Sequence, residues 1–318
     1  MSRTVAIPAP ADLHRARVLL QQALHPSPLV RAGEKTWLKL ESMQPTGAFK
    51  IRGALAALSA LKDQGRIVTA SAGNHALGVA WASRKLGVPV TIVVAENASP
   101  LKIEKLRKLG ADLVLHGQSF DDAENHALSL AAEGGHFLSP YNDTNVIAGQ
   151  ATVLDSILTQ MPDTTDPFTV VVPVGGGGLL AGMAVRRAEM EAEHITLVGV
   201  EAEASRAVSA SIEAGHTVTV SVGGTLADGL AGNLEKDSIT VDILREQRIP
   251  MMAVSEDEIR QAIRALFQNH GVIAEGAAAT AFAAAKLIET DQPVVAVITG
   301  RNIAWPLLRE VLDEDGRT

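Results

Sequence analysis

A single lysine lies within the stretch Gly-Ala-Phe-Lys-Ile-Arg-Gly-Ala, residues 47–54, shortly after a proline and a threonine. The apolar residues that follow predict a helix over residues 51–63, so Lys50 lies near a helix N-terminus. The helix dipole and burial both disfavour a charged amine there, and both lower the lysine pKa from about 10.4. Lys50 is therefore either a solvated surface charge or a nucleophilic amine.

Four consecutive glycines, Gly175–Gly178, follow an apolar strand-like run and precede an apolar helix-like run. Glycines let the backbone approach a phosphate closely, and a helix N-terminus offers free N–H groups to an anion. The alternative is a flexible turn, but four glycines in a row are costly in backbone entropy. This stretch predicts a phosphate cradle.

Two further turns carry polar residues after predicted strands, Ser-Ala-Gly-Asn-His at 71–75 and Thr-Gly-Arg-Asn at 299–302. In open α/β sheets, ligands gather at the carboxyl ends of strands. We therefore expect both turns and the tetraglycine to converge on one crevice, although residues 71–75 could also serve only as a helix cap.

A lysine beside a phosphate cradle indicates a phosphorylated aldehyde cofactor held as a Schiff base. The same glycines allow another interpretation, because Gly176-x-Gly178-x-x-Ala181 fits a dinucleotide fingerprint. Glu201 would then be the acid that binds a ribose. A nicotinamide enzyme, however, has no need of Lys50.

Short apolar runs alternate with helix-like segments along the chain, which predicts an α/β fold with mostly parallel sheets. The predicted strands are 37–40, 68–70, 90–94, 113–115, 169–174, 196–200 and 294–298. The predicted helices are 51–63, 74–86, 100–109, 120–133, 149–160, 179–193, 256–270 and 275–289.

The motifs resemble those of the serine/threonine dehydratase and serine racemase group, pyridoxal-phosphate enzymes of the tryptophan-synthase β-like fold (fold type II). The matching motifs are E-x-x-Q-P-T-G-A-F-K-x-R-G-A from Glu41, S-A-G-N-H-A from Ser71, G-G-G-G-L from Gly175, A-D-G-L-A at 227–231 and T-G-R-N at 299–302. The resemblance implies two three-layer, open, mostly parallel sheets with flanking helices. It implies a large cofactor-binding domain at 1–45 and 147–318, a small substrate-loop domain at 46–146, and an active site between them.

The resemblance also assigns roles to matching residues. Lys50 would form the Schiff base with pyridoxal 5'-phosphate and remove the substrate Cα proton. The other cofactor contacts would be Phe49 at the ring, Asn74 at the 3-hydroxyl, Gly175, Gly176, Gly177, Gly178 and Leu179 at the phosphate, and Thr299 at the pyridine nitrogen. The substrate carboxylate would be bound by Ser71, Gly73, Asn74 and His75, with Thr46 lining the same loop.

Several positions depart from the family pattern. Ala72 stands where serine racemases have the serine that moves a proton on the opposite face. Thr299 replaces a serine and keeps its hydroxyl, whereas Arg301 replaces a glycine. Some members bind a divalent cation with a carboxylate at the position of Ala207, so we expect no metal here.

The expected reaction is β-elimination from a 2-amino-3-hydroxy acid, as in threonine or serine dehydratases, giving a 2-oxo acid and ammonia. The alternatives within the family are a hydroxyaspartate dehydratase, with Arg301 meeting a second carboxylate, and an amino-acid racemase. Three acids have open roles: Glu275 as a helix cap or a cofactor neighbour, with capping favoured; Asp228 as an active-site or a turn residue; Glu201 as a metal ligand or a solvated strand end.

Composition restricts the partners of the protein. The 318 residues carry a formal net charge of −8, which argues against nucleic acid and anionic membranes. The chain has no cysteine and no apolar run of about 18 residues, so disulfides and a membrane span are not expected. We expect a small amino-acid substrate, a cytoplasmic location and, from the resemblance, a homodimer.

Overall fold

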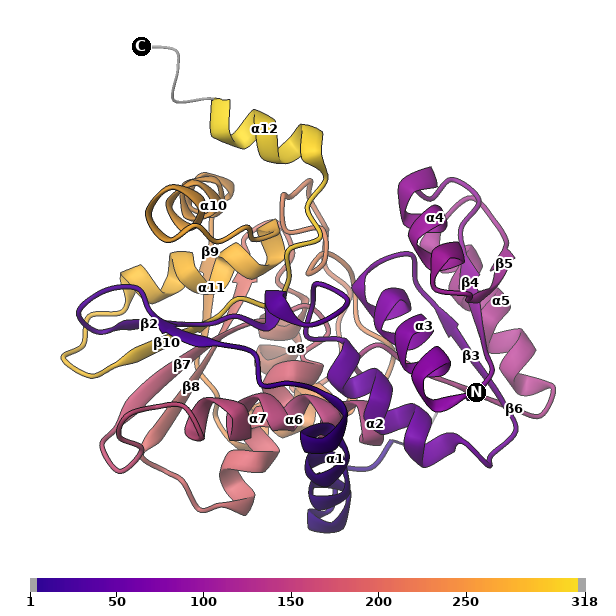
Figure 1. Cartoon of the computed structure of the whole chain (residues 1–318), viewed down its shortest axis with the longest axis horizontal. Helices are drawn as coiled ribbons and strands as arrows, with labels where there is room; N and C mark the ends of the chain where they lie inside the picture. Colours follow the sequence, from indigo (N-terminus) through magenta and orange to yellow (C-terminus); the bar gives the residue numbers. More distant parts are fainter. Residues whose placement is uncertain (1–4, 314–318) are drawn as a thin grey trace.

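The computed structural model describes residues 5–313, which form two sheets with helices on both faces of each (Figure 1). The larger sheet has the strand order β1-β2-β10-β7-β8-β9. Its strands are β1 (Leu29–Arg31), β2 (Thr36–Lys39), β7 (Phe168–Pro173), β8 (Ile195–Ala202), β9 (Met251–Val254) and β10 (Val294–Val297). Only the β1–β2 pair is antiparallel, and the remaining neighbours in this sheet run parallel.

The smaller sheet is parallel throughout, in the order β5-β4-β3-β6. Its strands are β3 (Arg66–Ala70), β4 (Val90–Val94), β5 (Asp112–Leu115) and β6 (Gly135–Phe137). Every residue of β4 is buried, as expected for a parallel strand covered on both faces. The expected α/β class with two mostly parallel sheets is confirmed.

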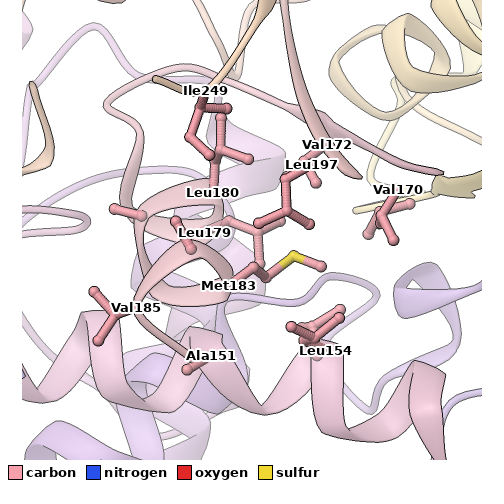
Figure 2. Packing of buried hydrophobic residues seen from close by; sticks show 14 of the residues in the cluster. Ala151, Leu154, Val170, Val172, Leu179, Leu180, Met183, Val185, Leu197 and Ile249 are labelled. Carbon is pink, nitrogen blue, oxygen red and sulfur yellow. The ribbon is translucent and has the colours of Figure 1, made fainter. Parts of the chain in front are cut away.

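Helices cover the larger sheet in two layers (Figure 1). One layer contains α6 (Thr144–Leu158) and α7 (Gly178–Glu189), and the other contains α10 (Glu256–His270) and α11 (Gly276–Leu287). Figure 2 shows the core beneath the first layer, where Leu179, Leu180 and Met183 of α7 pack toward Val172 and Leu197 of the sheet. This packing fixes the first turn of α7 directly after β7.

The smaller sheet is also covered on both faces. One face packs against α2 (Ile51–Leu61), α3 (Asn74–Leu86) and α4 (Pro100–Lys108). The other face packs against α5 (Phe120–Ala132). The remaining helices are α1 (Pro10–Ala23), the short 3-10 helix η1 (Glu41–Met43), α8 (Ala207–Ala214), α9 (Ile239–Glu246) and α12 (Trp305–Asp313). Within residues 5–313, none of the helices combines the length and apolar character needed to cross a bilayer.

The predicted elements are all present, with two kinds of difference. The bounds of β4, α3 and α10 are those expected, whereas α6 begins at Thr144 rather than at 149. Asp143 caps this helix, because its side chain accepts hydrogen bonds from the backbone N–H of Asn145 and Val146. The sequence did not predict β1, β6, β9, α1, α8, α9 or α12, which are short or begin without a clear apolar pattern.

Candidate active site

Lys50 lies at the N-terminal end of α2, with its ε-amine turned inward. The Nζ atom donates a 2.9 Å hydrogen bond to the carbonyl oxygen of Pro140 and lies 5.2 Å from the ring centre of Phe49. Loss of water around the amine lowers the Lys50 pKa to about 8, although the negative charge of Glu275 opposes this shift. A solvated surface lysine would not show these contacts, so the first of the two interpretations of Lys50 is wrong.

Gly78 allows α3 to approach Lys50 closely. A Cβ atom at Gly78 would lie 3.0 Å from the backbone carbonyl carbon of Lys50. Any larger residue would push the two helices apart, because protein interiors have little spare volume. The lysine backbone is therefore held against the helix that follows the Ser71–His75 turn.

The tetraglycine connects β7 to α7 and is covered by an aromatic ring. Gly177 has a φ of +82°, a conformation that glycine adopts readily, and it forms the N-cap of α7. A Cβ atom at Gly176 would overlap the ring of Tyr141, and one at Gly178 would lie 2.8 Å from the Tyr141 backbone. Because the first N–H groups of a helix have no intrahelical acceptor, this bend offers donors to an anion.

Pro140 and Tyr141 join these two features. Pro140 accepts the hydrogen bond from Lys50, and its neighbour Tyr141 packs on Gly176 and Gly178. The lysine amine and the tetraglycine bend are therefore connected through one short segment. The sequence did not predict a role for this segment, and its local signal was the single tyrosine of the chain in the polar run Ser139–Asp143.

Glu235 fastens this segment in place. Its carboxylate accepts hydrogen bonds from the hydroxyl of Ser139 and, at 3.1 Å, from the Asn142 side-chain nitrogen. Its backbone N–H donates to the Tyr141 hydroxyl oxygen at 2.5 Å. Glu235 was also missed, because it lies in an irregular stretch almost a hundred residues from its partners.

Asn74 belongs to a hydrogen-bonded group at the carboxyl ends of β3 and β10. Its Nδ2 donates to Glu275 Oε1 at 2.7 Å, and its Oδ1 accepts from Asn302 Nδ2 at 2.7 Å. Burial and the nearby charge of Asp228 raise the Glu275 pKa to about 7, although the hydrogen bond from Asn74 opposes this rise. Glu275 occupies the N-cap position of α11, as the favoured capping interpretation expected, but its carboxylate makes no cap hydrogen bond to that helix.

The residues expected at the substrate carboxylate lie around the start of α3. Ser71 Oγ accepts a 3.1 Å hydrogen bond from the backbone N–H of Gly73, the N-cap residue. The His75 ring is buried, with Nε2 3.0 Å from Thr69 Oγ1. Burial, with the nearby Lys50, lowers the His75 pKa to about 3. The His75 ring is therefore held within the fold by its contact with Thr69.

Thr46, Thr299 and Arg301 lie in two turns that contact each other. The Thr299 side chain is buried, and its backbone carbonyl accepts a 2.9 Å hydrogen bond from the Phe49 N–H. The Thr46 carbonyl accepts from the Asn302 side chain at 3.0 Å. Arg301 is exposed, with Nη1 3.2 Å from the sulfur of Met43.

Glu201 has a structural role that the sequence did not predict. It is buried, and it accepts hydrogen bonds from the backbone N–H of Val208 and Ser209 at 2.9 and 3.1 Å. A solvated strand end is therefore wrong, and the carboxylate is occupied at the start of α8. This removes the main support for a ribose contact, and hence for a nicotinamide site.

Among residues 5–313, no three His, Cys, Asp or Glu side chains gather closely enough to hold a metal ion.

Asp228 is exposed, and its Oδ2 lies 3.6 Å from Lys102 Nζ of α4. It therefore links the start of α4 to the irregular segment before α9.

Comparison with known proteins identifies matches along most of the chain. Residues 20–300 match the family model described as "Pyridoxal-phosphate dependent enzyme". The chain is 38% identical to an L-threonine ammonia-lyase of Thermotoga maritima, over 95% of this chain and 78% of that protein. It is 39% identical to the catabolic L-threonine dehydratase of Escherichia coli K12, over 86% of this chain and 84% of that protein.

Solved structures of a threonine deaminase and a serine racemase also resemble the chain. The processed form of threonine deaminase isoform 2 from Solanum lycopersicum has a TM-score of 0.87 and 31% identity, covering 100% of this chain and 92% of that one. Maize serine racemase has a TM-score of 0.86 and 27% identity, with 98% of each chain covered.

Proposed function

The chain belongs to the family of pyridoxal-phosphate dependent enzymes, and from that premise we propose how its residues carry out β-elimination from a 2-amino-3-hydroxy acid. The enzyme is an ammonia-lyase of the threonine dehydratase type, and we propose threonine as its main substrate. L-Serine is a second candidate, because it differs from threonine only by a methyl group.

The residues present fit pyridoxal 5'-phosphate. The aldehyde requires an amine with a lowered pKa, and Lys50 provides one. The phosphate requires N–H donors on a close-approaching backbone, and the tetraglycine at the start of α7 provides them. Asn74 would face the 3-oxygen, and the buried Thr299 would provide a neutral partner for the ring nitrogen. We propose Phe49 and Leu179 as further cofactor contacts.

The bound cofactor supplies an electron sink for the substrate Cα carbon. Lys50 Nζ is the proposed general base that takes the Cα proton, and its neutral form is accessible because its pKa is lowered. In the net step the Cα hydrogen and the β-hydroxyl leave together as one water, which gives an enamine, and later hydrolysis gives the 2-oxo acid and ammonia. The water released is balanced by the water consumed, so the net reaction needs no oxidant or other co-reactant.

The substrate carboxylate would bind at the start of α3. The first N–H groups of this helix favour an anion, and Ser71 and Gly73 shape the turn that precedes them. Thr46 would line the same side through the turn that contacts Asn302. We assign His75 a contact to the substrate through its backbone only, since its ring is hydrogen-bonded to the Thr69 side chain.

We further propose that the site lies between two units, residues 1–45 with 147–318 and residues 46–146. The two separate sheets support this division. We propose a homodimer from the family resemblance, and a cytoplasmic location as well.

The observation that carries this proposal is the link from Lys50 through Pro140 and Tyr141 to the tetraglycine. The test is release of 2-oxo acid and ammonia from L-threonine, L-serine and 3-hydroxyaspartate by the holoenzyme. Borohydride should reduce a visible chromophore and leave a pyridoxyl label on Lys50, found by peptide mass spectrometry. Lys50→Ala should lose the label and at least about 1,000-fold of the activity.

Two results would overturn parts of this proposal. A chromophore labelled at another lysine would remove Lys50 from its role. Turnover of 3-hydroxyaspartate far above that of threonine would reassign the substrate and would imply a cationic partner such as the exposed Arg301.

A further inference from the structure

A chain of hydrogen bonds fixes the orientation of the Asn74 amide, starting from a backbone carbonyl. The backbone carbonyl oxygen of Thr46 can only accept a hydrogen bond, and it receives one of 3.0 Å from Asn302 Nδ2. The same nitrogen donates to Asn74 Oδ1 at 2.7 Å. An amide nitrogen has two N–H groups, so Asn302 uses both and cannot be flipped without losing both contacts.

Glu275 closes the chain from the other side. Its Oε1 accepts from Asn74 Nδ2 at 2.7 Å, and its Oε2 accepts from the Asn302 backbone N–H at 3.1 Å. The Asn74 oxygen and one Asn74 N–H are thus committed to Asn302 and Glu275. Within the described chain, the second N–H on Asn74 Nδ2 remains as the group that this amide can offer to a ligand.

Two glycines provide the space for this arrangement. A Cβ atom at Gly300 would overlap the Glu275 carboxylate, and one at Gly47 would lie 3.0 Å from Asn302 Oδ1. Both glycines belong to the turns that carry Thr46 and Thr299. The close approach of Glu275 and Asn302 therefore depends on the local sequence of these turns.

We propose that Asn302 and Glu275 are positioning residues that hold an N–H of Asn74 toward the cofactor 3-oxygen and so select a cofactor with an oxygen at that position. This inference rests on the proposed function, in which Asn74 faces that oxygen. A flipped Asn74 would present its carbonyl to an anionic oxygen, and the two acceptors would repel each other. The network excludes that orientation because Asn302, fixed by the Thr46 carbonyl, presents a donor to the Asn74 oxygen. Glu275 adds to this above its pKa of about 7, where the ionised carboxylate offers only acceptors.

The test compares two cofactors on the apoprotein, pyridoxal 5'-phosphate and its 3-deoxy analogue. Dissociation constants measured by absorbance titration give the preference of each protein for the 3-oxygen. Wild type should prefer pyridoxal phosphate, and Asn302→Ala should reduce this preference about tenfold, as expected for one charge-assisted hydrogen bond. Asn302→Asp removes the same two donors at nearly constant size and should show the same reduction.

Asn145→Ala is the matched control, because the Asn145 side chain contacts Arg15 at the surface instead of the site. It should keep the wild-type preference. A purely structural role for Asn302 would lower thermal stability and weaken both cofactors equally, and an unchanged preference in the variants would overturn the inference. If Asn302→Ala does not fold, the preference of Asn302→Asp decides.

Failure of the proposed function has a different signature. Wild type would then take up neither cofactor as a borohydride-reducible adduct on Lys50. An adduct that forms with both cofactors, with equal preference in wild type and variants, would reject only the positioning role.

Discussion

The ε-amine of Lys50 donates a 2.9 Å hydrogen bond to the backbone carbonyl of Pro140, 90 residues further along the chain. The next residue, Tyr141, packs its ring over Gly176 and accepts a hydrogen bond from the Glu235 backbone. One segment therefore contacts both the amine and the tetraglycine bend. A shift of this segment would disturb both ends of the proposed cofactor site at once.

We expect the ε-amine of Lys50 in the apoprotein to become reactive at a lower pH than an ordinary lysine. Its pKa is lowered to about 8 by loss of water, so the neutral form becomes the major form as pH rises through that value. Acetylation of Lys50 by a brief pulse of acetic anhydride, followed by peptide mass spectrometry, should give a midpoint near 8. A midpoint near 10 would show that the amine is solvated.

Replacing Glu275 by glutamine should move that midpoint down. The negative charge of Glu275 raises the Lys50 pKa, so its removal further disfavours the charged amine. Glu104→Gln, which removes a surface carboxylate on α4, serves as the control and should leave the midpoint unchanged. An upward movement in Glu275→Gln would contradict the assigned electrostatics.

Local sequence predicted the elements with strong periodicity or clear ends. It also picked out, in short motifs, residues that we propose as cofactor contacts. Lys50, Asn74 and the tetraglycine belong to this group. The β6 strand was missed because it is three residues long and exists through its parallel pairing with β3. So short a strand cannot be recognised without knowing which neighbouring strand it pairs with.

The missed site residues share a second physical cause. Tyr141 and Glu235 act through contacts between segments far apart in the sequence, and such contacts leave no periodic signal. Glu275 precedes a helix and therefore satisfied a local rule for capping. Tertiary contacts determine where its side chain lies, because its carboxylate accepts hydrogen bonds from Asn74 and Asn302 and not from the start of the helix.

Gly176→Ala should weaken cofactor binding and destabilise the fold. A Cβ atom at this position would overlap the Tyr141 ring, and relief requires movement of the segment that also holds Lys50. We expect a loss of about 1–3 kcal/mol in the free energy of unfolding, the range for overpacking. Urea denaturation of the apoprotein and titration with pyridoxal phosphate measure the two effects.

Gly33→Ala provides the comparison for Gly176→Ala. The nearest atom to a Cβ at Gly33 is 3.6 Å away, which is an ordinary contact. This variant should retain wild-type stability and cofactor affinity. Equal behaviour of the two variants would show that Tyr141 moves aside without cost.

Glu41→Ala should destabilise the region that presents Lys50. Both oxygens of Glu41 accept 2.8 Å hydrogen bonds from Arg52, and both side chains are buried. Removing one partner leaves a buried unpaired charge, which costs about 3–5 kcal/mol. Chemical denaturation should show this loss, whereas Glu104→Ala, which breaks the exposed pair with Lys108, should change stability little.

The buried Glu41–Arg52 pair should also make the stability of the fold depend on pH under acidic conditions. Burial alone would raise the Glu41 pKa, but the charge and hydrogen bonds of Arg52 hold it below the ordinary value of 4.5. A carboxyl group with a lowered pKa stabilises the fold above its unfolded-state pKa, and this stabilisation is lost as pH falls through the folded value. The unfolding free energy of wild type should therefore fall below about pH 4.5 more steeply than that of Glu41→Gln.

Ala72→Ser should introduce racemisation into a site that otherwise eliminates. Exchange of the Cα configuration needs a proton carrier on the face opposite Lys50. Serine racemases resemble the stretch from Ser71 to His75 but read S-S-G-N-H, with a serine at the position of Ala72. With L-serine as substrate, chiral chromatography should show D-serine formation increased about 100-fold over wild type, the lower range for general acid–base catalysis. Ala72→Gly changes the same position without adding a hydroxyl and should form no additional D-serine.

Substantial D-serine from the wild-type enzyme would instead assign the second proton route to the Ser71 hydroxyl or to water. The variant Ser71→Ala would then distinguish these two sources.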